Sequence, residues 1–235
     1  MNEGSAAACS AVSRWRTGTL GIMQMLVPTP LGDARITRFP AVAGCRAVLM
    51  LGHGAGGGVE APDLQALAAD LPPSGIEVVL VEQPWRVAGR RLAPAPKTLD
   101  VGWRAVMEWW PAHAPDHAAG APVIVGGRSA GARVACRTGA DTGARGVLAL
   151  AFPLHPPSKP TKSRVDELLG SGLPTLVVQG AVDPFGTPAE YPPLPPGHRL
   201  VALSAGGHEF AVRKGQTPVL DEITRAVAEW LDALL

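Results

Sequence analysis

The sequence predicts an α/β fold in three layers: a mostly parallel central sheet with helices on both faces. Short apolar runs recur along the chain, and segments with helical periodicity alternate with them. Near-continuous apolar runs are typical of parallel strands, because helices cover both faces of such a sheet. The alternation of the two kinds of segment therefore indicates strands joined by helical crossovers.

The first half of the chain begins this alternation. Residues 46–51, an arginine followed by five apolar residues, predict a buried strand. Residues 61–71 predict a helix, with a proline in the first turn and apolar residues at helical spacing. Residues 76–82 predict the next strand. Residues 98–110 predict a helix that Pro111 ends, because proline disfavours the helical conformation of the residue before it.

The second half continues in the same way. Strands are predicted over residues 122–126, 146–151, 174–179 and 198–203, and helices over 129–138, 164–169 and 217–235. The last helix is amphipathic, with its apolar residues on one face. The weaker apolar segments 26–28 and 34–39 are candidates for an antiparallel edge of the sheet.

Length and composition indicate one globular domain. The chain has 235 residues, of which 46% are hydrophobic and 17% are charged, and this balance excludes an intrinsically disordered protein. We expect residues 25–235 to form a single domain and residues 1–24 to be a disordered extension.

Charge and cysteine patterns exclude several kinds of partner and site. The net charge is +1, without a basic cluster, so we expect no nucleic-acid partner. No apolar run reaches the length of a membrane span, so we expect no membrane association. The three cysteines fit neither a zinc site nor a disulfide framework, so we expect a cytoplasmic protein without metal or cofactor. The sequence leaves the oligomeric state open.

Residues 127–131, Gly-Arg-Ser-Ala-Gly, match the pattern G-x-S-x-G, which places a serine on a sharp turn between a strand and a helix. A predicted strand leads into the motif and a predicted helix follows it. The serine backbone is strained at such a turn, and the two glycines remove side chains that would collide with neighbouring backbone. We therefore expect Ser129 to be an exposed nucleophile. The alternative is a glycine turn with a helix-capping serine.

A nucleophilic serine needs a base, and in this arrangement the chain order is serine, acid, histidine. Asp183 and His208 each follow a predicted strand, so both lie at the carboxyl ends of parallel strands, where such sheets bind ligands. His208 would take the proton from Ser129, and Asp183 would orient the imidazole. Other candidates are His155 and His198 for the base, and Glu190 and Asp166 for the acid.

A glycine-rich loop, Gly-His-Gly-Ala-Gly-Gly-Gly at 52–58, follows the first predicted strand. A developing oxyanion needs backbone N–H donors in a dry cleft. We expect an oxyanion hole made by Ala130, the residue after the serine, and by Gly54 or Ala55. The alternative is a phosphate-binding loop, but the chain has no G-x-x-x-x-G-K-[ST] motif and only a partial G-x-G-x-x-G.

Four strings resemble a known family: LGHGAGGG at 51–58, GGRSAGAR at 126–133, FPLHPP at 152–157 and VQGAVDPFGT at 178–187. Together they resemble the α/β-hydrolase superfamily near its dienelactone-hydrolase-like branch. They are most similar to a small group that includes an animal testis-expressed protein and a subunit of the non-specific lethal chromatin complex.

This resemblance implies an α/β-hydrolase fold with Ser129, Asp183 and His208 in the catalytic positions. The chain departs from the group at Ala130, where methionine or a similar residue is usual. A backbone N–H donor is unaffected by that change. The resemblance implies little about the substrate.

The surroundings of the expected site suggest an open cleft for a small molecule. The connection between the predicted strands 146–151 and 174–179 is too short for a large cap. Side chains near the site are candidates for substrate binding: His53, Trp85, Arg86, Arg128 and His155. Trp85 and the arginines after it would bind an anionic group of the substrate. The alternative is that Trp85 packs in the core and the arginines are solvated.

These observations predict a hydrolase that cleaves a carboxylic ester or thioester of a small molecule through an acyl-enzyme. Two alternatives remain. One is a non-catalytic interaction module that has kept the fold, and the other is a peptidase or acyltransferase that uses the same three residues.

Overall fold

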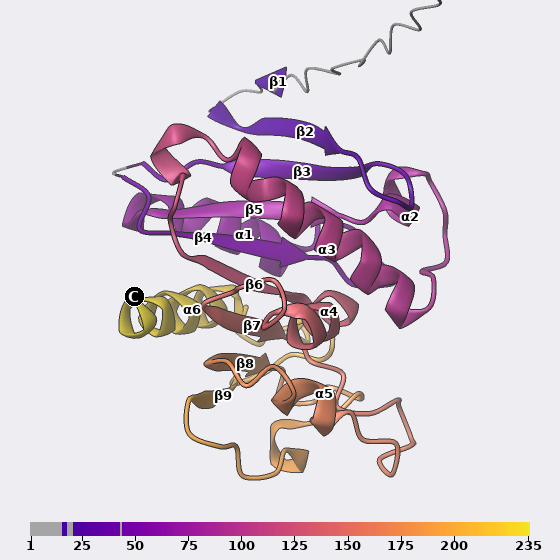
Figure 1. The fold of residues 1–235 in the computed structure, drawn as a ribbon. Helices are drawn as coiled ribbons and strands as arrows, with labels where there is room; N and C mark the ends of the chain where they lie inside the picture. The colour runs from indigo at the N-terminus through magenta and orange to yellow at the C-terminus, as the bar shows by residue number, and fades with distance from the viewer. Residues whose placement is uncertain (1–15, 18–20, 43) are drawn as a thin grey trace, which may run out of the picture.

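The structure is a computed structural model that describes residues 16–17, 21–42 and 44–235 (Figure 1). In this part of the chain the strands are β1 (Arg16–Thr17), β2 (Met23–Val27), β3 (Ala34–Phe39), β4 (Ala47–Gly52), β5 (Ile76–Glu82), β6 (Val123–Arg128), β7 (Gly146–Leu150), β8 (Thr175–Gln179) and β9 (His198–Ala202). The helices are α1 (Pro62–Asp70), α2 (Pro84–Val87), α3 (Pro96–His113), α4 (Ala130–Thr138), α5 (Val165–Leu169) and α6 (Leu220–Leu234).

The described strands form one sheet in the order β1-β2-β3-β5-β4-β6-β7-β8-β9. The strands from β5 to β9 in this order are parallel, and β1, β2 and β3 form an antiparallel edge. The mostly parallel sheet and its antiparallel edge are as predicted. In a parallel sheet the carboxyl ends of the strands share one edge, and the loops that follow β4, β6, β8 and β9 therefore lie together.

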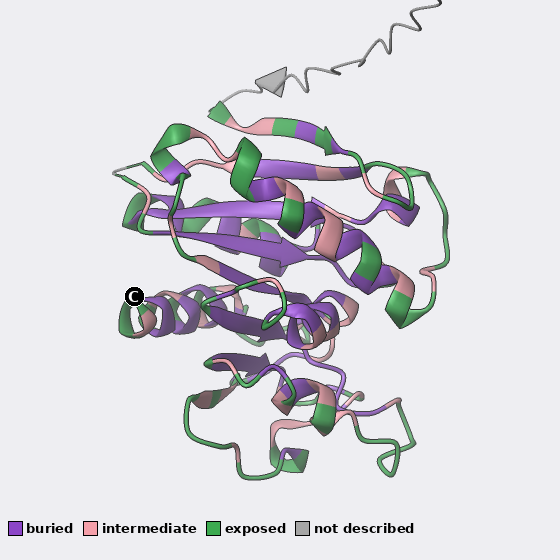
Figure 2. Cartoon of the chain, viewed as in Figure 1, coloured by how far each residue is buried: buried purple, intermediate pink, exposed green. Residues whose placement is uncertain are grey.

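Helices cover both faces of the sheet (Figure 1). On one face α3, α4 and α5 pack against side chains that include Val48 and Met50 of β4. On the other face α1 and α6 pack against Leu49 and Leu51 of the same strand. Alternate residues of a strand point to opposite faces, so β4 contributes to both hydrophobic cores. The central strands are accordingly buried along their length (Figure 2).

Within the described residues, the carboxyl edge of the sheet has no large cap. Residues 151–174, which join β7 to β8, contain the short helix α5 and otherwise loops. This agrees with the predicted open cleft. No helix in the described part of the chain is long and apolar enough to cross a membrane.

Two expectations concern element boundaries. The prediction that Pro111 ends its helix is wrong, because α3 continues to His113. The proline lies in the last turn, where the missing N–H and the clash with the preceding turn affect little of the helix. Most of the expected extension at residues 1–24 lies outside the described residues, and Met23 and Gln24 belong to β2.

Candidate active site

Ser129 lies on a sharp turn between β6 and α4. Its backbone has φ 51° and ψ −110°, a conformation that non-glycine residues rarely adopt. The N–H of Ser129 donates a hydrogen bond of 2.9 Å to the carbonyl oxygen of Leu150 at the end of β7. A strained backbone conformation persists only where the surrounding structure holds it in place. Here the surrounding structure holds Ser129 at the carboxyl edge of the sheet.

Gly127 and Gly131 allow this turn to pack against the end of β4. A Cβ atom at either position would collide with the carbonyl oxygen of Gly52. Gly127 also has φ 155°, near the limit of the region that favours glycine. The two glycines of the motif are therefore required by backbone contact.

The side chains of Ser129, His208 and Asp183 form a continuous chain of hydrogen bonds. Nε2 of His208 lies 2.8 Å from Oγ of Ser129, and Nδ1 lies 2.9 Å from Oδ2 of Asp183. An ionised carboxylate only accepts hydrogen bonds, so Nδ1 carries the proton and donates to Asp183. Nε2 is then the acceptor for the Ser129 hydroxyl. The structure brings together the three residues that sequence reasoning placed in one site.

The Asp183 carboxylate is fully buried and held from both sides. Gln179, the last residue of β8, donates through Nε2 to Oδ2 at 2.9 Å, and the N–H of Phe185 donates to Oδ1 at 2.8 Å. Oε1 of Gln179 lies 3.0 Å from the hydroxyl of Tyr191. These contacts fix the carboxylate, and through it the plane and tautomer of His208.

Arg128 ties the His208 loop to α1. Its Nη2 donates to the carbonyl oxygen of His208 at 2.9 Å, and its Nε lies 3.3 Å from Oδ2 of Asp63, in the first turn of α1. Burial raises the pKa of the Asp63 carboxyl, and the Arg128 charge opposes that rise. Arg128 and Asp63 are both buried, and their contact is an ion pair without a hydrogen bond of good geometry.

The glycine-rich loop passes beside the serine. A Cβ at Gly54 would lie 3.6 Å from the Cβ of Ser129, so the loop backbone is in contact distance of the serine. Ala130 is the first residue of α4, where a backbone N–H has no partner within the helix. Gly54, Ala55 and Ala130 line one small cavity, so the loop and the start of α4 lie next to each other beside Ser129.

His53 anchors this loop. Its Nδ1 lies 2.8 Å from the carbonyl oxygen of Gly54, and its Nε2 accepts the N–H of Gln83 at 3.1 Å. Burial lowers the pKa of His53, which keeps the ring neutral and suits this pair of contacts. Both ring nitrogens are engaged within the protein, so the ring holds the loop, and the suggested substrate-binding role of His53 stays a prediction.

Two cavities of very different size lie near this site: Ala130 lines one and Arg128 lines the other, while Ser129 lines neither. The small cavity has a volume of about 10 Å³. The residues that line it include Gly54, Ala55, Trp85, Leu99, Trp103, Ala130 and Val134. The large cavity has a volume of about 430 Å³. Its lining includes Gly58, Pro62, Arg128, Glu209, Phe210, Ala211, Val212 and Leu220.

The remaining candidate side chains are those of His155, His198, Asp166 and Arg86. His155 lines a third cavity with Glu190, and its Nε2 lies 2.9 Å from that carboxylate, while its suggested substrate-binding role stays a prediction. His198 begins β9, at the opposite edge of the sheet. Asp166 is exposed on α5. Arg86 forms an ion pair of 3.2 Å with Glu60.

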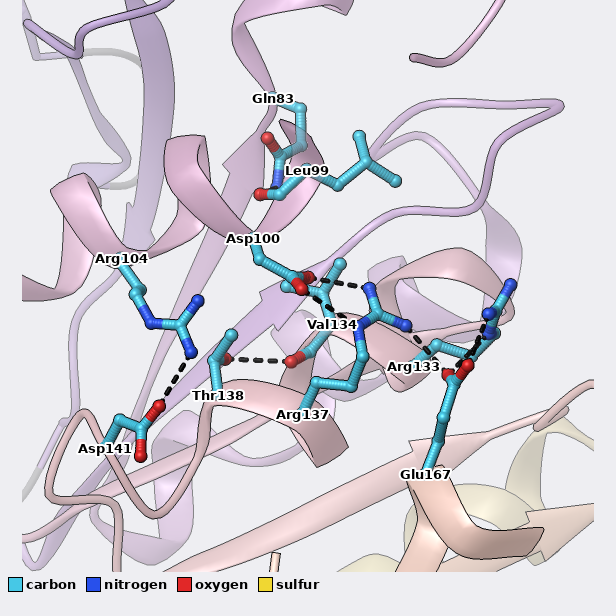
Figure 3. A network of polar contacts seen from close by, with 10 residues as sticks. All are labelled: Gln83, Leu99, Asp100, Arg104, Arg133, Val134, Arg137, Thr138, Asp141 and Glu167. Atoms are coloured by element: carbon cyan, nitrogen blue, oxygen red, sulfur yellow. Dashed lines mark hydrogen bonds and ion pairs between the residues drawn. The ribbon is translucent and has the colours of Figure 1, made fainter. Parts of the chain in front are cut away.

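Figure 3 shows how α4 is held between α3 and α5. Arg133 donates two hydrogen bonds to Glu167 of α5, at 2.8 and 2.6 Å. Arg137, one turn further along α4, donates two to Asp100 of α3 at 2.9 and 2.6 Å, and a third to Glu167 at 2.8 Å. Two-point contacts fix both distance and direction, so they orient the helix that begins after Ser129.

Comparison with known proteins fits this geometry. A family model described as an alpha/beta hydrolase domain matches residues 45–234. The chain belongs to the α/β-hydrolase family. The expected membership is thereby confirmed, while the resemblance to the testis-expressed group stays a prediction.

Solved structures similar to this α/β hydrolase share its fold. A serine hydrolase without a lid from Xanthomonas campestris is 19% identical, with a TM-score of 0.69 over 94% of this chain and 98% of that one. Est1E from Butyrivibrio proteoclasticus is 13% identical, with a TM-score of 0.70 over 90% and 98% of the two chains. A dienelactone hydrolase from Anabaena variabilis is 17% identical, with a TM-score of 0.64 over 94% and 98%.

Sequence reasoning missed three polar residues of this α/β-hydrolase site: Asp63, Gln179 and Tyr191. Gln179 gave a usable signal, because a polar side chain ends an otherwise apolar strand just before the Asp183 loop. Asp63 gave no such signal. Acidic residues are common in the first turn of a helix, where they interact favourably with the helix dipole.

Proposed function

We propose that this α/β hydrolase cleaves a carboxylic ester or thioester, with Ser129 as nucleophile, His208 as general base and acid, and Asp183 as the group that orients His208. The observation that supports this most strongly is the continuous hydrogen-bond chain, with contacts of 2.8 and 2.9 Å. These are the distances needed for proton transfer from a serine to an imidazole.

In the first half of the reaction, Oγ of Ser129 attacks the carbonyl carbon of the substrate, and its proton passes to Nε2 of His208. The carbonyl electron pair moves to oxygen and forms an oxyanion. When the oxyanion collapses, the bond to the leaving oxygen or sulfur breaks, and the leaving group takes the proton from His208. An acyl-enzyme on Ser129 and a free alcohol or thiol result.

In the second half, a water molecule attacks the acyl carbon and gives a proton to Nε2 of His208. The second oxyanion collapses, the bond to Oγ breaks, and Ser129 recovers the proton. The product is a carboxylic acid. Asp183 stabilises the imidazolium in both halves and stays ionised.

The oxyanion would be held by backbone N–H groups of Ala130 and of Gly54 or Ala55. Donors fixed in the backbone need no reorganisation as the charge develops, which makes them effective in a dry site. His53 would act as a positioning residue, because it fixes the loop that supplies the second donor.

Backbone strain favours a catalytic role over an interaction module. A non-glycine residue at φ 51° costs about 1–3 kcal/mol, and a surface that only binds a partner gains nothing from it. The choice among esterase, thioesterase, peptidase and acyltransferase rests on a structural neighbour. Among the structural neighbours, a Pyrococcus furiosus protein is described as an esterase, and we adopt ester or thioester hydrolysis on that basis.

We propose a small-molecule substrate and a cytoplasmic location. The two cysteines in the described part of the chain, Cys45 and Cys136, are both free thiols, which suits a reducing compartment.

The test is hydrolysis of p-nitrophenyl acetate by the wild type and by Ser129→Ala. We expect the substitution to abolish enzyme-dependent turnover while the circular dichroism spectrum stays unchanged. Ser163→Ala, an exposed serine outside the site, is the matched control and should keep wild-type activity. Turnover retained by Ser129→Ala would overturn the proposal.

A further inference from the structure

We propose that Tyr191 and Gln179 act as positioning residues for the Asp183 carboxylate: the Tyr191 hydroxyl fixes the Gln179 amide, and that amide fixes the carboxylate. This inference rests on the proposed function and extends its machinery by two side chains. It follows from a line of hydrogen bonds that runs from Tyr191 through Gln179 and Asp183 to His208, with each contact at 2.9 or 3.0 Å.

The partners of the Gln179 side chain decide which way its amide points. Its Nε2 lies 2.9 Å from Oδ2 of Asp183 and 2.8 Å from the carbonyl oxygen of Gly186. An ionised carboxylate and a carbonyl group only accept hydrogen bonds, so these contacts use both N–H donors of the amide. Oε1 must then face a donor, and the hydroxyl of Tyr191 lies 3.0 Å from it.

The Tyr191 hydroxyl is held as a donor by its own surroundings. It also lies 3.0 Å from the carbonyl oxygen of Phe152, so both of its partners are acceptors and the hydroxyl has to keep its proton. Burial raises the pKa of Tyr191, and the negative charge of Asp183 raises it further. Tyr191 therefore offers Gln179 a donor at every pH at which the protein is folded and active.

Loss of this donor would disturb the amide. Gln179 is fully buried, so without the Tyr191 hydroxyl its Oε1 would be a buried acceptor that lacks a partner, which is costly. A rotated amide would place Oε1 against the Asp183 carboxylate and the Gly186 carbonyl, where both contacts would be repulsive. One hydroxyl group thus selects the orientation in which the amide donates to Asp183.

The amide in turn restricts the carboxylate. Oδ2 of Asp183 accepts from Gln179 and from Nδ1 of His208, and Oδ1 accepts the N–H of Phe185 at 2.8 Å. A carboxylate that is held at both oxygens does not rotate freely, so Oδ2 keeps its direction toward Nδ1. That direction matters because it selects the tautomer of the imidazole that can take a proton from serine.

The backbone after β8 brings the partners to Gln179. Gly186 has φ 132°, and a Cβ there would lie 2.7 Å from the Cβ of Leu154, so only glycine lets its carbonyl come this close. Tyr191 follows directly on a single 3-10 turn, Pro188–Glu190. The loop that carries the acid therefore also carries the two groups that orient Gln179.

The test measures kcat and KM for p-nitrophenyl acetate. Gln179→Met keeps nearly the same shape without the amide and should lower kcat by about 10- to 100-fold, the effect of losing a hydrogen bond to a charged group. Tyr191→Phe removes one oxygen atom and should lower kcat by about 3- to 10-fold. KM should change little, because both side chains are buried and their polar atoms are engaged within the protein.

The double variant shows whether Tyr191 acts through Gln179. If it does, Tyr191→Phe lowers kcat in the wild-type background and has no further effect in the Gln179→Met background. A general structural contribution of the hydroxyl would lower kcat by the same factor in both backgrounds, and that result would overturn the inference.

Thr175→Val is the matched control. Thr175 is fully buried at the amino end of β8, the strand that ends with Gln179, and its hydroxyl donates to the carbonyl oxygen of Leu173 at 2.9 Å. The substitution removes a buried hydroxyl from the same strand but far from its carboxyl end. We expect a lower free energy of unfolding in urea and an unchanged kcat.

A second readout does not depend on turnover. The proton on Nδ1 of His208 gives a low-field NMR signal when a carboxylate holds it. Gln179→Met and Tyr191→Phe should shift or broaden this signal, and Thr175→Val should leave it as in the wild type.

The outcomes separate this inference from the function on which it rests. If turnover requires Ser129 but both variants keep the wild-type kcat and NMR signal, the positioning role is wrong and the hydrolase proposal stands. If no ester is cleaved, the hydrolase proposal fails, and the NMR signal decides the positioning role: a change in Gln179→Met and Tyr191→Phe supports it, and an unchanged signal overturns it.

Discussion

Nε2 of His208 lies 2.8 Å from Oγ of Ser129, although 79 residues separate them in the sequence. The carboxyl ends of β6 and β9 deliver the two side chains to one edge of the sheet. Each neighbouring contact restricts the pair further, since Arg128 holds the His208 backbone and Asp183 holds its ring. The imidazole is therefore held in position before any substrate binds.

Asp183→Asn should lower kcat for p-nitrophenyl acetate by about 10⁴-fold without unfolding the protein. An asparagine amide that donates to Nδ1 favours the tautomer with a proton on Nε2, which cannot accept the Ser129 proton. Asp166→Asn makes the same chemical change at an exposed acid on α5 and should leave kcat unchanged. A loss of less than about 10-fold in Asp183→Asn would contradict the assigned role of Asp183.

Gly131→Ala should destabilise the protein by about 1–3 kcal/mol, measured by urea unfolding. Alanine normally stabilises a helix relative to glycine, but here its Cβ would collide with the Gly52 carbonyl. At Gly56 a Cβ has open space, so Gly56→Ala is the control and should change the free energy of unfolding little. Equal stability of the two variants would mean that α4 does not pack as closely on β4.

Glu167→Gln should reduce stability by roughly 1–2 kcal/mol at pH 7. Burial raises the Glu167 pKa, but hydrogen bonds and charge from Arg133 and Arg137 outweigh it and lower the pKa below 4.5. A group with a lowered folded-state pKa stabilises above its unfolded pKa and loses that contribution as the pH falls. The difference between variant and wild type should therefore be full at pH 7 and shrink below about pH 4.5.

Glu108→Gln, at an exposed position of α3, is the control for this series. Its free energy of unfolding should follow that of the wild type across the whole pH range. A difference for Glu167→Gln that stays constant from pH 7 to pH 3 would show that the ion pairs in Figure 3 do not govern it.

Cys136 should resist alkylation in the folded protein at pH 8. Burial raises the pKa of this thiol to about 12, and only the thiolate reacts at a useful rate. Site-resolved mass spectrometry after iodoacetamide treatment should find Cys136 modified only after denaturation. Equal rates in the folded and denatured protein would contradict the closed packing of α4 on the sheet.

Much of the fold was predictable because each segment carried its own signal. The run at residues 76–82 gives the bounds of β5 directly, since β-branched and aliphatic residues fill a strand buried on both faces. The prediction from Pro111 was wrong because the local preference of proline does not show where a helix ends. The proline lies in the last turn of α3, and the helix continues to His113.

The catalytic residues of the site could be predicted from the sequence, but the contacts of the residues around them could not. Ser129, Asp183 and His208 were found because motif and strand ends specify them together. His53 and His155 were assigned by position along the chain, which says nothing of their partners Gln83 and Glu190. The sizes of the two cavities depend on side chains from four or more segments of the chain. A local sequence pattern therefore cannot predict them.

The most direct test of the account is reaction of the folded protein with a fluorophosphonate probe, followed by mass spectrometry of the labelled peptide. A nucleophilic serine attacks the phosphorus and displaces fluoride, so a single adduct should appear on Ser129. Asp183→Asn should slow this labelling, and Ser129→Ala should abolish it. Folded wild-type protein that stays unlabelled, or that carries the label on another residue, would contradict the assignment of Ser129 as the nucleophile.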